Sequence, residues 1–332
     1  MDMEPETGRR EQGGKKIGMG TLAMRRALAG SALAASMLAV SAATASAATA
    51  LAATRGKLEL VKALPLDGPA LVQPAGLAWD AKRLLMVCSV HDDDIYAVDP
   101  QADKAVFKEA IRIRRPQEAQ GMKLGWRGIT VGQDGDYYLA AEQACRILRV
   151  DNSGSGEWFG PSLLEAGAEK GLFAGNNSGL EGLAQIGKRK FLVAAAREPR
   201  GLLEVDLSGK APALTAWLSD KTSLILPAGR RRPDFTDLAE DQGKIWALCA
   251  NSDAICQLQW NGAEYVEGES WSYAHVAEDP KYKFMGLRMG LARGLAMDGQ
   301  SIYIAMDNKG VGRQNDPSDK RPLLLVFKRP RG

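Results

Sequence analysis

The stretch ARGLAMDGQSIYIAMDN, from Ala292 to Asn308, places a small-residue turn before Gly-Leu-Ala and then a short strand pattern that ends in Asp-Asn. Four earlier stretches repeat the pattern: PAGLAWDAKRLLMVCSV from Pro74, WRGITVGQDGDYYLAAE from Trp126, LEGLAQIGKRKFLVAAA from Leu180 and FTDLAEDQGKIWALCAN from Phe235. One shared position, called the marker here, is filled by Gly76, Gly128, Gly182, Asp237 and Gly294, in steps of 52, 54, 55 and 57 residues. A nearly constant period of this length indicates a repeated supersecondary unit.

Each copy continues into further strand patterns. A third strand ends in an apolar-Asp pair, as in IYAVD at Ile95, RILRVD at Arg146 and LLEVD at Leu202, and a hairpin turn follows. Four short strands joined by Gly, Asp and Asn turns are typical of one antiparallel blade. The sequence therefore predicts an all-β fold, a β-propeller of four-stranded blades arranged radially.

The two ends of the repeat region predict how the ring closes. The last copy has only one more strand, PLLLVFK, after its second, while LELVKAL at Leu58 belongs to no copy of its own. Pairing this N-terminal strand into the last blade would protect two sheet edges at once. The markers favour five blades, with six as the alternative, and residues 56–332 are predicted to form a single β-propeller domain.

The first 47 residues are predicted to be a cleaved signal peptide with a preceding extension. Arg25 and Arg26 come before a small-apolar run that ends in the cleavage pattern Ala45-Ser46-Ala47. This run is too short and too rich in alanine for a spanning helix. We therefore expect a periplasmic or secreted protein without an integral membrane span in the mature chain.

An oxidising compartment would permit disulfides, and Cys249 and Cys256 flank a predicted turn across which they could form one. The alternative is that they are small buried side chains within strands.

Composition excludes several function classes. The net charge is only +3 and no basic stripe with interleaved aromatic residues occurs, so we expect no nucleic-acid partner. Only two histidines, His91 and His275, are present, which rules out a three-histidine zinc site.

The repeat predicts where the residues of a functional site lie. The first strand of each blade lines the central channel, and the turn after the second strand returns to the same end of it. Residues at or just before the marker should therefore converge with residues of those turns around one channel mouth. These residues include Arg127, Glu181, Asp237 and Arg293 from the first set, and Glu142, Asn251 and Asp307 from the second.

The charges at this mouth suggest a site for an anion and a cation. Arg127 and Arg293 could hold a small anionic substrate, since guanidinium groups match phosphate and carboxylate oxygens. Glu181, Asp237 and Asp307 could bind a hard cation such as calcium through oxygen ligands. Glu142 and Asn251 would contact the substrate. The alternative is that these charges pair with one another and plug the channel.

The segment NNSGLEGLAQIGKRKFLVAAARE, from Asn176 to Glu198, resembles the phytase-like (esterase-like) exported β-propellers. ARGLAMDGQSIYIAMDN resembles the late blade of that family, in which an acidic residue usually stands in the place of Arg293. PDFTDLAEDQGKIWALCAN, from Pro233, resembles its middle blade, with Asp237 matching. The resemblance spans roughly Leu58 to Lys328.

The resemblance implies an exported propeller that hydrolyses phosphate or other esters with calcium, with Glu181 and Asp237 as catalytic and metal-binding residues. Arg127 and Arg293 depart from the family pattern. Two alternatives remain open: a calcium-dependent lactonase of the gluconolactonase type, and a non-catalytic scaffold propeller that binds a component of the cell envelope.

Overall fold

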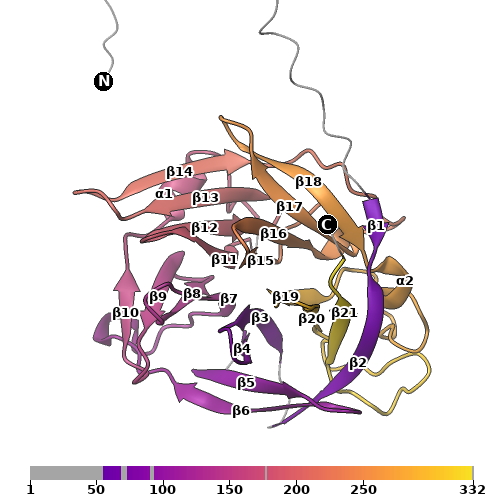
Figure 1. Cartoon of the computed structure of the whole chain (residues 1–332). Coiled ribbons are helices and arrows are strands. Elements are labelled where there is room, and N and C mark those ends of the chain that lie inside the picture. The colour runs from indigo at the N-terminus through magenta and orange to yellow at the C-terminus, as the bar shows by residue number, and fades with distance from the viewer. Residues whose placement is uncertain (1–54, 69–72, 90–92, 176–177, 331–332) are drawn as a thin grey trace, which may run out of the picture. The chain divides into compact units, whose positions relative to one another are not determined.

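A computed structural model describes residues 55–68, 73–89, 93–175 and 178–330. The predicted signal peptide and His91 lie outside these residues. The described chain is all-β, as predicted, and its strands form four-stranded antiparallel units around a central axis (Figure 1).

Units 1 to 3 run outward from the axis in chain order. Unit 1 contains β3 (Pro74–Trp79), β4 (Leu84–Cys88), β5 (Asp94–Pro100) and β6 (Ala105–Arg112). Unit 2 contains β7 (Trp126–Val131), β8 (Tyr137–Ala141), β9 (Arg146–Val150) and β10 (Gly156–Phe159). Unit 3 contains β11 (Leu180–Gly187), β12 (Lys190–Ala195), β13 (Gly201–Asp206) and β14 (Ala213–Leu218).

The last two units involve the N-terminal strands. Unit 4 contains β15 (Asp237–Asp241), β16 (Lys244–Cys249), β17 (Ala254–Trp260) and β18 (Tyr265–Ser272), with β1 (Arg55–Lys57) parallel to β18. Unit 5 contains β19 (Ala292–Met297), β20 (Ser301–Met306), β21 (Leu323–Lys328) and β2 (Glu59–Asp67). The antiparallel pairing of β2 with β21 confirms that the N-terminal strand completes the last unit.

Helical structure is confined to the connections. It comprises η1 (Gln117–Ala119), α1 (Leu164–Ala168), η2 (Ala250–Ser252) and α2 (Ala274–Ala277). Within the described residues, no helix has the length and apolar character to cross a membrane.

The core consists of five apolar clusters, and each lies between two neighbouring units. Phe191 and Tyr138 pack between units 2 and 3, for example, whereas Phe327 and Trp246 pack between units 4 and 5. The cluster between units 5 and 1 contains Leu64 of β2. Burial of apolar surface therefore continues around the whole ring, and β2 contributes to it directly.

The marker positions explain the repeat in physical terms. A Cβ at Gly76 would lie 2.3 Å from the carbonyl oxygen of Arg127, and one at Gly182 would lie 2.3 Å from the backbone nitrogen of Leu238. A Cβ at Gly128 would lie 2.7 Å from the carbonyl oxygen of Glu181, and one at Gly294 would lie 2.6 Å from Leu77 Cγ and 3.0 Å from its backbone nitrogen. The inner strands thus approach one another backbone to backbone, which only glycine permits at these positions.

Asp237 replaces glycine at the fourth marker and is fully buried. Its Oδ2 accepts hydrogen bonds from the backbone N–H groups of Leu77 (3.2 Å) and Leu295 (2.8 Å), and its Oδ1 accepts one from Leu238 (2.9 Å). The carboxylate therefore links units 4, 5 and 1 across the axis. The glycine markers and Asp237 together are called the marker ring below.

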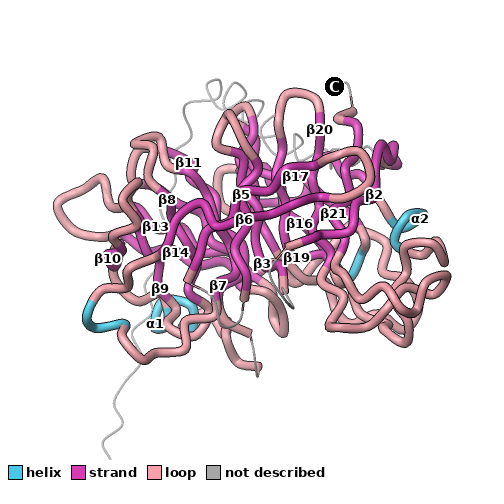
Figure 2. Tube along the Cα trace, turned by 90° about the horizontal axis from the view of Figure 1, so that it is seen from below, coloured by secondary structure: helices cyan, strands magenta, loops and turns pink. Residues whose placement is uncertain are grey.

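The two ends of the axis carry different connections, with short hairpins at one end and longer loops at the other (Figure 2). On one side lie the hairpins that join the first and second strands of each unit, such as residues 80–83 and 298–300; we call this the hairpin face. On the other side lie the longest connections, including residues 160–175, 219–236 and 273–291; we call this the loop face.

Cys249 and Cys256 lie on adjacent strands as buried free thiols, with their Sγ atoms 3.7 Å apart. They are diagonal neighbours, because Cys256 lies opposite Ala247 and Cys249 lies opposite Ala254. The nearby thiol of Cys256 and burial both raise the pKa of Cys249, which disfavours the thiolate that exchange chemistry requires.

We therefore expect both cysteines to be alkylated when the protein is denatured in iodoacetamide without reductant, as read by peptide mass spectrometry. Protection of both until a reductant is added would instead show that the chain forms the disulfide.

Candidate functional site

The candidate site is a cluster of charged side chains on the loop face of the marker ring. Arg127, Glu181 and Arg293 each come directly before a marker, on the inner strands β7, β11 and β19. Glu142 follows β8 and Asp307 follows β20, at the start of the turns that return to this face. The repeat thus brings together charges far apart in the sequence, as predicted.

Arg127 connects two acidic residues. Its Nη2 and Nε donate to Glu142 Oε2 at 2.5 and 2.9 Å. Its Nε also lies 3.8 Å from Glu181 Oε2, which is an ion-pair distance and too long for a hydrogen bond. Arg127 therefore forms ion pairs with neighbouring charges at the channel mouth, which was the alternative to a ligand site.

Three buried polar atoms of this cluster have no hydrogen-bond partner among the described residues: Glu142 Oε1, Glu181 Oε2 and Arg293 Nε. Glu181 is 3% exposed and Arg293 is 8% exposed, so bulk water does not solvate these atoms freely. An unpaired polar group is costly when buried. Two unpaired acceptors and one unpaired donor therefore form a set that a small polar ligand would satisfy.

Burial raises the pKa of Glu181, while Arg127 and Arg293 oppose the shift by attracting its carboxylate. For Arg127 burial acts to lower the pKa, but the attraction of Glu181 and Glu142 outweighs it and the net shift is upward. Arg127 is therefore a fixed cation. A carboxyl group whose pKa is moved toward neutrality can both accept and donate a proton at working pH.

Three predicted site residues have other roles in the structure. The carboxylate oxygens of Asp237 accept hydrogen bonds from the backbone N–H groups of Leu77, Leu295 and Leu238. Asp307 forms an ion pair with Lys309 and accepts a hydrogen bond from its backbone N–H. Asn251 fastens two long connections, since its Nδ2 donates to Arg232 O at 3.0 Å and its Oδ1 accepts from Gly290 N at 3.2 Å.

The carboxylates predicted to bind calcium do not combine into a metal site in the described part of the chain. No group of three or more His, Cys, Asp or Glu residues there has an arrangement that could hold a metal ion. The oxygens of Asp237 accept three backbone hydrogen bonds and Asp307 is paired with Lys309, so both predicted partners of Glu181 make other contacts. Calcium binding stays a prediction, and no step below depends on it.

Asp234 belongs to the same region but was not singled out from the sequence. It is 2% exposed, and its Oδ1 accepts the backbone N–H of Asn251 at 2.8 Å. Burial raises its pKa to about 6, against the attraction of Arg293 and Arg197. Its position three residues before the fourth marker offers no repeat signal, because the other copies have no acidic residue there.

The raised pKa of Asp234 predicts how stability depends on pH. The folded state holds this proton up to about pH 6, whereas the unfolded chain releases it near the ordinary value of 3.8. Stability should therefore fall as pH rises through this window, by on the order of 2–3 kcal/mol from this group.

Thermal unfolding between pH 4.5 and 7 measures this dependence. Asp234→Asn keeps the acceptor for Asn251 but cannot titrate, so its melting temperature should depend less on pH. An equal slope in both proteins would contradict the assignment.

No family model matches the chain, and no curated protein matches it in sequence. The solved structures that resemble it include glutaminyl cyclase of Myxococcus xanthus, with 11% identity, a TM-score of 0.50 and coverage of 84% of this chain and 100% of that one. A gluconolactonase of Xanthomonas campestris has 12% identity, a TM-score of 0.41 and coverage of 78% and 86%. Virginiamycin B lyase of Staphylococcus aureus has 14% identity and a TM-score of 0.38, with 76% of this chain and 66% of the lyase covered, so the chain spans about two thirds of the lyase.

At these identities the comparisons concern the fold alone. The likeness to the glutaminyl cyclase agrees with the β-propeller architecture described above.

Proposed function

We propose that this protein is an exported hydrolase of phosphate or related esters that acts on a small anionic substrate at the loop face. The phytase-like resemblance of the Glu181 segment suggested this class of reaction. The observation that supports it is the set of unpaired buried atoms on Glu181, Glu142 and Arg293 beside the fixed cation Arg127.

The chemistry assigns each residue a role. Arg293 Nε donates to an anionic oxygen of the substrate, and Arg127 stabilises negative charge nearby. The Glu181 carboxylate accepts a proton from the attacking water while the water oxygen forms its bond to the phosphorus or carbonyl carbon of the ester. Glu181 then returns that proton to the departing alkoxide, so the carboxylate is regenerated.

Glu142 Oε1 would accept a hydrogen bond from a substrate hydroxyl. Asp237 takes no part, because its oxygens are already occupied by backbone donors. A lactone is an internal carboxylate ester, so a lactonase would use the same residues.

The test uses the purified mature chain with an aryl phosphate, an aryl acetate and a δ-lactone, each assayed with EDTA and with added calcium. We expect turnover of at least one class, and a higher KM for Arg293→Ala. Turnover that EDTA abolishes and calcium restores would favour the metal-assisted reaction. No turnover of any class, together with no binding of inorganic phosphate, would overturn the proposal.

A further inference from the structure

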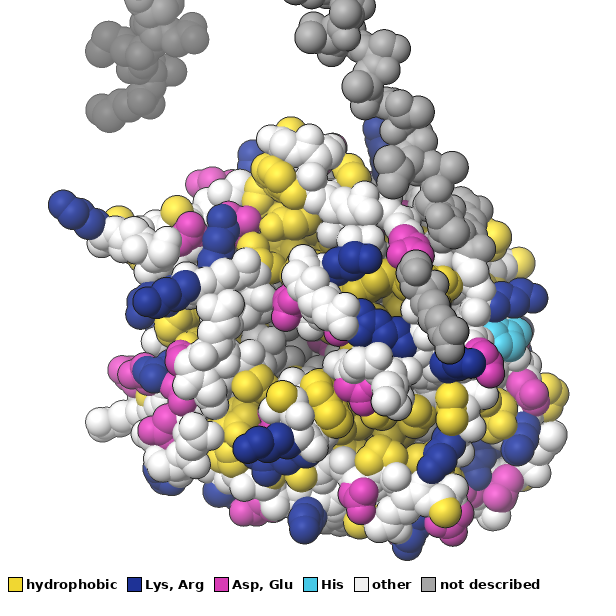
Figure 3. Space-filling view, viewed as in Figure 1, with side chains coloured by type: hydrophobic (Ala, Val, Ile, Leu, Met, Phe, Trp, Pro, Cys, Tyr) yellow, Lys and Arg dark blue, Asp and Glu magenta, His cyan; other side chains and the backbone are white. Residues whose placement is uncertain are grey.

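A large cavity lies on the hairpin face, on the opposite side of the marker ring from the candidate site. It has a volume of about 1490 Å³ and reaches from the ends of the inner strands outward between units 3 and 4. Figure 3 shows this face hollowed near its centre, with hydrophobic side chains exposed around the hollow. Leu77, Leu238 and Leu295, each directly after a marker, line its inner end, so it ends at the level of the marker ring.

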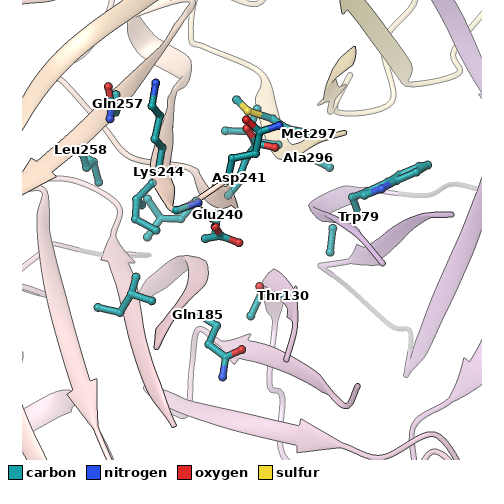
Figure 4. A pocket seen from close by; sticks show the side chains of 18 of the residues that line it. Trp79, Thr130, Gln185, Glu240, Asp241, Lys244, Gln257, Leu258, Ala296 and Met297 are labelled. Carbon is teal, nitrogen blue, oxygen red and sulfur yellow. Dashed lines mark hydrogen bonds between the residues drawn. The ribbon is translucent and has the colours of Figure 1, made fainter. Parts of the chain in front are cut away.

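Uncharged polar side chains line much of this cavity. Gln133 and Thr130 come from unit 2, Gln185 from unit 3, and Gln257 and Gln259 from unit 4; Figure 4 shows Thr130, Gln185 and Gln257 on separate strands around the cavity.

Part of the hydrogen-bonding capacity of these amides is already used. Gln185 Oε1 accepts from Gln133 N at 2.7 Å, and Gln257 Oε1 accepts from Gln259 Nε2 at 3.1 Å. These bonds orient the Gln185 and Gln257 amides, each of whose Nε2 groups has two N–H donors.

The charged groups of the lining are of both signs, and some of them form ion pairs. Lys190 pairs with Glu204 at 2.8 Å, and Asp241 pairs with Arg329. Asp298 accepts from two backbone N–H groups and from the hydroxyl of Tyr303. Within the described residues, Lys244, Glu240 and Asp298 line the cavity without an ion pair. Lys244 and Glu240 are exposed, and Glu240 accepts a hydrogen bond from the backbone N–H of Gly243 at 2.6 Å. The cavity therefore offers little net charge to a ligand.

Aromatic side chains stand at the outer end of the cavity. Trp260 is 51% exposed although it is large and apolar. Its ring packs edge-on against Trp217 and Tyr265, with centroids 5.5 and 5.2 Å apart. Trp217 Nε1 donates to Ala263 O at 3.0 Å, and Tyr265 OH donates to Glu204 Oε2 at 3.4 Å. These contacts fix the orientation of the three aromatic rings.

We infer that this cavity binds a neutral oligosaccharide. A sugar ring presents hydroxyl groups along its edge, which the amides can both donate to and accept from, and C–H groups on its face, which pack against an aromatic ring. A nucleic acid or acidic polymer would need unpaired cations, and a lipid would need a lining without amides. The volume exceeds that of ordinary small-ligand pockets, of roughly 300–1,000 Å³, so several sugar units fit.

The test is titration calorimetry of the full mature chain with neutral hexasaccharides: an α-1,4-glucan, a β-1,4-glucan and a β-1,4-linked N-acetylglucosamine chain. We expect saturable binding of at least one. Trp260→Ala should weaken it at least 10-fold and Gln257→Ala several-fold, while Trp260→Phe, which keeps an aromatic face, should stay within about threefold.

Leu164→Ala is the matched control, because Leu164 is 52% exposed and lies outside the cavity, on α1. Its affinity should be unchanged. Glu181→Gln should also bind the sugar normally, so failure of the hydrolase proposal would leave this one standing. No saturable binding of any hexasaccharide, equal binding by Trp260→Ala, or preferential binding of dextran sulfate or a peptide would overturn the inference.

Discussion

Glu181→Gln is expected to lower kcat/KM for the ester substrate by about 10²–10⁴, the range that a positioned proton-transfer group contributes. Glutamine fills the same space and can accept the same hydrogen bonds, but it cannot take a proton from water. KM should change little, because Arg127 and Arg293 still hold the anion. The loss should therefore appear mainly in kcat.

The pH profile separates a chemical role of Glu181 from a structural one. Burial raises the pKa of Glu181, so the wild-type rate should fall as pH drops through that raised value and the carboxylate is protonated. Glu181→Gln should lack this acid limb. Its folded stability at neutral pH should be equal or higher, because the raised pKa of Glu181 means that the ionised carboxylate costs the folded state stability.

Glu240→Gln is the matched control, because Glu240 lines the hairpin-face cavity on the other side of the marker ring. It should retain wild-type kinetics. If Glu181→Gln kept full activity, or if Glu240→Gln lost as much, Glu181 would not be the proton-transfer residue.

The repeat predicted the ring because the same backbone contact recurs in each unit. Gly76 and Gly182 are needed where one inner strand meets the next, so their spacing carries the architecture directly. The closing role of β2 followed from counting strands, and its pairing with β21 confirms it. The convergence of Arg127 and Glu181 followed from the same register.

The sequence could not predict which carboxylates are available for chemistry. Asp237 and Glu181 occupy neighbouring positions of the repeat and are both buried. Asp237 accepts hydrogen bonds from three backbone donors, whereas one oxygen of Glu181 has no hydrogen-bond partner among the described residues. That difference depends on the exact position of Leu77 and Leu295 across the axis, which no local pattern records.

The hairpin-face cavity was missed for a related reason. Trp217 and Gln257, which line it, come from the strands β14 and β17, outside the marker positions, and β17 lacks the apolar-Asp ending of the third strands in units 1 to 3. The repeated positions next to the markers lie at the loop face, so the repeat pattern pointed to that face alone. The outer strands vary from unit to unit, so the shape that they enclose emerges only from the packed structure.

Gly182→Ala is expected to destabilise the folded protein by about 3 kcal/mol or more. The added Cβ would lie 2.3 Å from Leu238 N and 2.4 Å from Asp237 C, and both are backbone atoms of the next inner strand. A flexible side chain could move aside at little cost, but here β15 would have to shift. That shift would also stretch the hydrogen bonds that the backbone N–H groups of Leu77 and Leu295 donate to the Asp237 carboxylate. The loss of stability therefore involves contacts of three units.

Urea unfolding measures this effect, and β11 itself supplies the control. Gly187 lies on the same strand, but a Cβ there would meet Lys190 Cβ at an ordinary 3.5 Å. Gly187→Ala should therefore change the free energy of unfolding by no more than about 0.5 kcal/mol. Equal stability of the two variants would mean that the inner strands do not meet at the marker ring, and the two faces of the axis would no longer be separate sites.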